Sequence, residues 1–125
     1  MRNILLVEDN VQLNALLTTK LERCGYAVRH AANGKEALTM YEQLEPDLII
    51  TDIIMPEVDG VEFLSRVKEQ HPGAKFRTLA MSGGGQLSGA TYLKWMAAFG
   101  ADSLIEKPFN LADFITRVEA LIECD

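Results

Sequence analysis

Short apolar runs alternate along the chain with longer segments of helical periodicity. Several of the runs are continuous rather than alternating in polarity, which is typical of strands that helices cover on both faces. The runs that predict strands lie at residues 4–7, 26–28, 48–51, 78–81 and 103–105. Each is followed by a segment in which apolar residues recur every three or four positions, as on one face of a helix.

Five such helical stripes can be traced. They contain Leu13, Leu16, Leu17, Leu21 and Cys24; Ala37, Leu38 and Tyr41; Phe63, Leu64 and Val67; Leu93, Met96 and Ala97; and Phe114, Ile115, Val118, Leu121 and Ile122. Strict alternation of strand and helix predicts an α/β fold with a doubly wound parallel sheet. Ligands of such sheets collect at the carboxyl ends of the strands, so candidate chemistry is expected there.

Composition fits this prediction. The chain has 125 residues, 48% of them apolar and 24% charged, which suits a single domain over 1–125 that folds by burial alone. A net charge of −6 repels nucleic-acid phosphates and argues against direct nucleic-acid binding. No apolar run approaches the length of a membrane span. Cys24 and Cys124 lack metal-ligand spacing and are interpreted as reduced thiols of a cytoplasmic protein.

Polar residues follow four of the predicted strands, namely Glu8 with Asp9, Asp52, Ser82 and Lys107. Each alone has an ordinary interpretation as a helix-capping acid, a turn residue, a loop hydroxyl or a surface lysine. Together they fall on one sheet edge, where three carboxylates repel one another unless a cation joins them. Hard oxygen ligands favour Mg²⁺, and a lysine with a hydroxyl beside them suits a phosphoryl group.

The chain resembles the receiver domains of two-component response regulators over essentially its whole length. The stretches that carry the resemblance are residues 5–10, 46–60, 81–83, 100–102 and 106–109, with Asp-x-x-Met-Pro-x-x-x-Gly at 52–60 and Lys-Pro-Phe at 107–109. The resemblance implies a (βα)5 flavodoxin-like or CheY-like sandwich with strand order 2-1-3-4-5. It also implies a signalling module rather than a classical enzyme, although one that catalyses its own phosphoryl transfer and slow autodephosphorylation.

In such a receiver, Asp52 would take a phosphoryl group from a phosphohistidine of a sensor histidine kinase or histidine phosphotransfer protein. Asp9, Asp52 and the backbone carbonyl of Ile54 would bind Mg²⁺, and Glu8 would act directly or through a water. Lys107 would pair with the phosphoryl oxygens. Two further features are implied: Ser82 would donate a hydrogen bond to the phosphoryl group, and the Lys107–Pro108 peptide bond would be cis.

Several positions depart from the usual receiver pattern. Leu104 stands where the family usually has Tyr or Phe, so the usual aromatic switch cannot work in that form. The stretch from Ser82 to Lys107 is longer than usual, with the excess near the glycines at 83–85. Ile54 and Gly84 offer no polar side chain to orient a hydrolytic water, which predicts a long-lived acyl phosphate.

The segment from Gln86 to Ala101 has Lys94 as its only charged residue and is rich in apolar residues. One interpretation is a fourth helix that is more buried than average. The other is an output surface in which Tyr92, Trp95 and Phe99 contact a downstream protein or a second copy of the chain.

Two alternatives to a stand-alone receiver stay open at this stage. The residues could be a receiver from a longer regulator or hybrid kinase, with an attached output domain. A phosphohydrolase of the haloacid dehalogenase type is more remote, because that class requires an Asp where this chain has Ile54.

Overall fold

The computed structural model describes residues 2–53, 60–83 and 100–123. They form one sheet of five parallel strands in the order β2-β1-β3-β4-β5. The strands are β1 (Asn3–Val7), β2 (Ala27–Ala31), β3 (Leu48–Asp52), β4 (Arg77–Gly83) and β5 (Ser103–Lys107). The predicted doubly wound fold and its strand order are confirmed.

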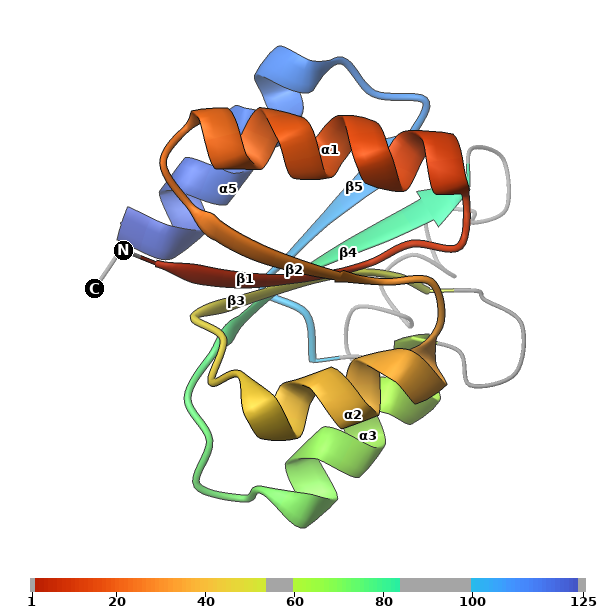
Figure 1. Cartoon of the computed structure of the whole chain (residues 1–125), viewed down its shortest axis with the longest axis vertical. Coiled ribbons are helices and arrows are strands. Elements are labelled where there is room, and N and C mark those ends of the chain that lie inside the picture. Colours follow the sequence, from red (N-terminus) through yellow and green to blue (C-terminus); the bar gives the residue numbers. More distant parts are fainter. Residues whose placement is uncertain (1, 54–59, 84–99, 124–125) are drawn as a thin grey trace.

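The helices lie on both faces of this sheet (Figure 1). On one side are α1 (Val11–Arg23) and α5 (Leu111–Glu123), and on the other are α2 (Gly34–Gln43) and α3 (Gly60–Gln70). The predicted fourth helix, with Tyr92, Trp95 and Phe99, lies outside the described residues.

The sheet divides the core into two apolar layers. Side chains of β1 alternate between them: Ile4 and Leu6 pack with the α1 and α5 side, whereas Leu5 and Val7 pack with the α2 and α3 side. All four are completely buried. Each buried aliphatic side chain stabilises the fold by about 1.5–3 kcal/mol. Since helices cover both faces of the sheet, successive residues of a strand are all buried, which explains the continuous apolar runs of the sequence.

The stripe predicted for the first helix is only partly buried. Leu17 and Leu21 are fully buried, but Leu16 is 51% exposed and Cys24 is also exposed. On an α-helix Leu16 lies about 100° around the axis from Leu17, so it points away from the sheet. The buried face of α1 is therefore narrower than the sequence indicated.

Side-chain caps fix the points at which α1 and α2 begin. The Asn10 side chain accepts a hydrogen bond of 2.9 Å from the Leu13 backbone, and the Asn33 side chain accepts one of 2.9 Å from the Glu36 backbone. Such caps satisfy backbone N–H groups that the first helical turn leaves without partners. The cap at Asn10 closely follows Glu8 and Asp9, so it limits where the chain can run after β1.

Candidate functional site

Three carboxylates meet at the carboxyl ends of β1 and β3, which are neighbours in the sheet. Asp52 is the last residue of β3 and is 4% exposed, Glu8 directly follows β1 and is fully buried, and Asp9 is exposed. One carboxylate oxygen from each residue lies within 4.8 Å of the other two. The structure thus brings together the acidic residues that the sequence placed at this edge.

Lys107 reaches the same cluster from the far edge of the sheet. It ends β5, which is separated from β3 by β4. Its Nζ lies 2.6 Å from Glu8 Oε1 and 2.7 Å from Asp52 Oδ1, so a single ammonium contacts two carboxylates. The Lys107–Pro108 peptide bond is cis, as the resemblance implied.

Ser82 lies on β4, between the strands that carry Asp52 and Lys107. Its side chain is 3% exposed, and its Oγ has no hydrogen-bond partner among the described residues. A buried hydroxyl without a partner costs free energy, so such a group is suited to bind a further oxygen.

Burial raises the pKa of Asp52 above its usual range. The hydrogen bond and the charge of Lys107, together with the Asp9 backbone hydrogen bond, act in the opposite direction but do not cancel this effect. The Asp52 carboxylate is therefore largely shielded from water but keeps its hydrogen bonds to Lys107 and to the Asp9 backbone. Such desolvation is common where a side chain takes part in chemistry.

The donor set fits a hard divalent cation. Carboxylate oxygens are the ligands that Mg²⁺ prefers, and they are held close together here. Glu8 Oε2 has no hydrogen-bond partner among the described residues, and Asp9 is open to solvent. The carbonyl of Ile54, the fourth predicted ligand, lies outside the described residues, as does Gly84.

The backbone around Asp52 is held from two directions. Thr51 Oγ1 donates a 3.0 Å hydrogen bond to the Asp52 carbonyl oxygen. A Cβ on Gly60 would collide with that same oxygen, so α3 can begin against the end of β3 only with glycine at this position. Gly60 belongs to the sequence motif, but its contact with Asp52 could not be read from the sequence.

Leu104 of β5 is a core residue. It is 3% exposed and belongs to the core layer of Phe63 and Val67, on the α2 and α3 side of the sheet. In this structure it fills the core.

Sequence reasoning also missed Asn14. This polar residue lies between Leu13 and Leu17 in the stripe of α1, and it is 6% exposed. A polar residue inside an apolar stripe was the available signal.

Comparison with known proteins identifies the class. Residues 4–119 match the model of the response regulator receiver domain. CpdR, a response regulator receiver protein of Brucella abortus, is 33% identical over 125 residues, which cover 98% of each chain. CheY4, a chemotaxis protein of Vibrio cholerae, superposes with a TM-score of 0.85 at 28% identity, over 97% of this chain and 98% of that one.

The chain therefore belongs to the response regulator receiver domain family of two-component systems. This membership removes the haloacid dehalogenase alternative. Many relatives are longer: the chain spans 49% of the transcriptional regulator RpaA of Synechocystis, at 32% identity, and 12% of the sensor kinase CckA of Brucella abortus, at 36% identity.

Within the described ranges, no helix is both long and apolar enough to cross a bilayer.

Proposed function

We propose that Asp52 is the phosphoryl acceptor of this receiver. A carboxylate oxygen of Asp52 attacks the phosphorus of a phosphohistidine on a sensor histidine kinase or a histidine phosphotransfer protein. The P–N bond breaks, the donor imidazole leaves with the electron pair, and an acyl phosphate forms on Asp52. The observation that carries this proposal is the buried Asp52 carboxylate 2.7 Å from Lys107 and within 4.8 Å of two further acids.

Asp9 and Asp52 are proposed to hold Mg²⁺ together with the Ile54 carbonyl, with Glu8 acting directly or through a water. Bound there, the ion neutralises negative charge on the phosphoryl oxygens as the group is transferred. The exposed side of this cluster lies at Asp9, which gives an incoming cation access without opening the core.

Lys107 and Ser82 are proposed to bind the transferred group. The Lys107 ammonium already contacts Asp52 Oδ1, so a short shift brings it onto a phosphoryl oxygen attached to that carboxylate. Ser82 Oγ, which has no partner among the described residues, donates a hydrogen bond to another phosphoryl oxygen. These two contacts would link phosphorylation to β4 and β5.

We also propose that residues 1–125 form one cytoplasmic receiver that does not bind nucleic acid itself and acts by switching a protein-interaction surface. The net charge of −6 supports the exclusion of nucleic acid. Output through an attached domain fits the longer relatives, and output through a separate protein fits CpdR, which has similar length. A surface around Tyr92, Trp95 and Phe99, used for a target or a homodimer, stays a sequence-based hypothesis.

The direct test is modification by a small phosphodonor. With acetyl phosphate and Mg²⁺, intact mass spectrometry should show one acid-labile phosphoryl group, and peptide mapping should place it on Asp52. Asp52→Asn should abolish the modification, whereas Asp113→Asn, which changes an exposed carboxylate at the start of α5, should leave it intact. Full acid-labile phosphorylation of the Asp52→Asn protein would rule out the assignment.

A further inference from the structure

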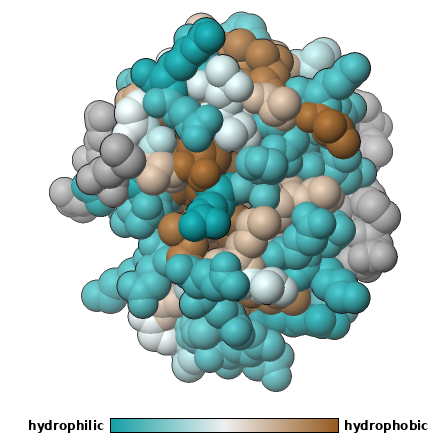
Figure 2. All heavy atoms as spheres, in the orientation of Figure 1, coloured by the Kyte–Doolittle hydropathy of each residue, from teal (hydrophilic) through white to brown (hydrophobic). Residues whose placement is uncertain are grey.

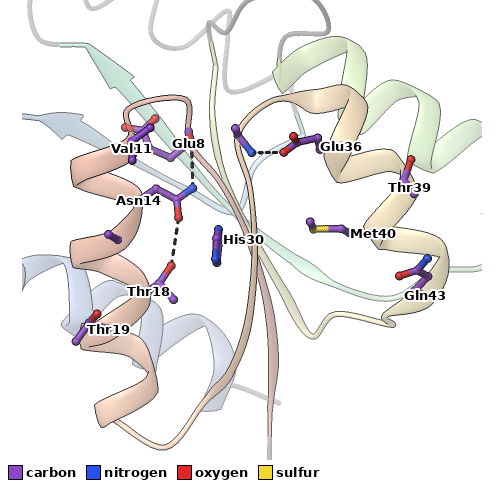
Figure 3. A pocket seen from close by; sticks show the side chains of 12 residues that line it. Glu8, Val11, Asn14, Thr18, Thr19, His30, Glu36, Thr39, Met40 and Gln43 are labelled. Carbon is purple, nitrogen blue, oxygen red and sulfur yellow. Dashed lines mark hydrogen bonds between the residues drawn. The ribbon is translucent and has the colours of Figure 1, made fainter.

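Asn14 is a buried polar residue of α1 with no role in the proposed chemistry. Its Nδ2 donates hydrogen bonds to the carbonyl oxygens of Glu8, at 3.0 Å, and Ala31, at 3.2 Å. Its Oδ1 accepts a hydrogen bond from Thr18 Oγ1 at 3.3 Å. Figure 3 shows the Asn14 side chain between the Glu8 backbone and Thr18.

These bonds hold the backbone where the chain leaves the sheet. The Glu8 backbone N–H donates to Ala31 O at 3.0 Å, and the Glu8 carbonyl accepts from Asn14, so both polar groups of this residue are bound. Immediately after Glu8 comes Asp9, followed by the helix cap at Asn10. The acidic pair therefore lies on a short connection that is fixed at its start by Asn14 and at its end by the cap.

Only a side-chain amide matches this set of partners. One NH₂ group donates hydrogen bonds to two carbonyl oxygens, and the amide oxygen accepts a hydrogen bond from the Thr18 hydroxyl. A leucine of similar size would leave the Glu8 carbonyl without this donor, and an aspartate would place negative charge against two carbonyl oxygens. The two carbonyl oxygens fix the orientation of the amide, since in the reversed orientation the amide oxygen would face both of them without a donor, whereas the Thr18 hydroxyl can bond to the amide in either orientation.

Among the described residues, the Asn14 amide bonds to two main-chain carbonyls and the Thr18 hydroxyl, not to a carboxylate. It lies on the wall of a groove of about 830 Å³ between α1 and α2, which Thr18, His30 and Met40 also line. Figure 2 shows this groove as a hollow in which apolar and hydrophilic side chains meet. Asn14 contacts the backbone of Glu8, so any effect on the acidic cluster is transmitted through the position of that backbone.

We propose that Asn14 is a positioning residue, which holds the Glu8–Asp9 connection in the geometry that binds Mg²⁺ beside Asp52. This inference rests on the proposed magnesium site. Neighbours that orient metal ligands typically change metal affinity when they are removed, although they never touch the ion. Asn14 would act in this way through a main-chain carbonyl.

The first experiment measures Mg²⁺ affinity by isothermal titration calorimetry. Asn14→Ala and Asn14→Asp are each expected to weaken binding about tenfold, and Thr18→Ala less, because it loosens the amide without removing it. The control is Leu21→Ala, which opens a cavity under the same helix but removes none of these hydrogen bonds. Unchanged affinity in both Asn14 variants and Thr18→Ala, or equal weakening in Leu21→Ala, overturns the proposal.

The second experiment needs no metal and separates this proposal from the proposed function. Amide hydrogen exchange of Glu8 should accelerate relative to that of Leu6, inside β1, in Asn14→Ala and more weakly in Thr18→Ala. In Leu21→Ala the exchange rates of the Glu8 and Leu6 amides should change by the same factor. If wild-type protein fails to bind Mg²⁺, the proposed function fails, and the ratio of exchange rates still decides whether Asn14 fixes the connection. If the ratio of the Glu8 and Leu6 exchange rates in both Thr18→Ala and Asn14→Ala equals that of wild type, the positioning role of Asn14 is refuted.

Discussion

Lys107 Nζ lies 2.6 Å from Oε1 of Glu8, a carboxylate that is completely buried. A buried charge requires an opposite charge nearby, and removal of one partner leaves the other without compensation. Lys107 also contacts Asp52, so its single positive charge is shared between two acids before any cation or phosphoryl group arrives. The lysine expected to bind the phosphoryl group is therefore also a structural counter-ion of the resting protein.

Replacement of Lys107 by methionine is expected to destabilise the metal-free protein by about 3 kcal/mol, because Glu8 loses its charged partner inside the protein. Urea denaturation in the presence of a chelator measures the change. The double variant Glu8→Gln with Lys107→Met should recover part of the loss, since only Asp52 then remains as a buried carboxylate without its ammonium partner. If Lys107→Met unfolds at the wild-type urea concentration, the ion pair has no structural role.

Asp52 should make stability depend on pH in metal-free buffer. Burial raises its pKa in the folded state above the ordinary value of 3.8, so the folded chain binds a proton more tightly than the unfolded chain. The contribution of Asp52 to the free energy of unfolding is fully present below pH 3.8 and is lost as pH rises through the pKa of the folded state. Asp52→Asn should therefore be more stable than wild type at neutral pH.

Urea denaturation across the acidic range checks this expectation. The advantage of Asp52→Asn should shrink as pH falls and disappear below the ordinary pKa of aspartate. An advantage that stays constant with pH would show that titration of Asp52 is not its cause.

Glycine at position 60 should be essential for both stability and the site. Gly60→Ala is expected to cost about 3 kcal/mol, because the new methyl group would overlap backbone atoms of Asp52 and Ile53, which cannot move aside as a flexible side chain can. Phosphorylation by acetyl phosphate should also slow, since the clash displaces the Asp52 carbonyl. Gly73→Ala is the control, because nothing lies within 4 Å of a Cβ there, and it should be neutral or slightly stabilising. Equal unfolding midpoints for the two variants would contradict the argument.

Leu104 is expected to act in packing and not in phosphoryl acceptance. Leu104→Ala should lower the free energy of unfolding by about 3 kcal/mol, because it leaves a cavity beside Phe63 and Val67. Below its unfolding temperature, this variant should accept a phosphoryl group at the wild-type rate. Leu16→Ala, at a 51% exposed position, should change stability by less than about 0.5 kcal/mol. A selective loss of phosphorylation in Leu104→Ala would instead connect this residue to the switch.

The sequence predicted the sheet and its functional edge because parallel strands bring their carboxyl ends to one side. It could not give the extent of β2, which runs on through the exposed residues Arg29 and His30, because backbone pairing with β1 holds them rather than apolar burial. Nor could it show that Lys107 contacts both Glu8 and Asp52. Which carboxylates the Lys107 ammonium reaches depends on the spacing and twist of β3, β4 and β5 at their carboxyl ends. Hydrophobic periodicity carries no information on these distances.

The position of Lys107 in the chain also bears on protein synthesis. Lys107 and Glu8 are 99 positions apart, and β5 is the last of the five described strands to be synthesised. A nascent chain that has already made β1, β3 and β4 carries Glu8, Asp9 and Asp52 without their lysine, and like charges at one edge oppose closure of that fragment. Translation must reach Lys107 before any ammonium offsets part of the charge at this acidic edge. Truncated products that end before Lys107 should thus fold poorly and be good substrates for proteolysis.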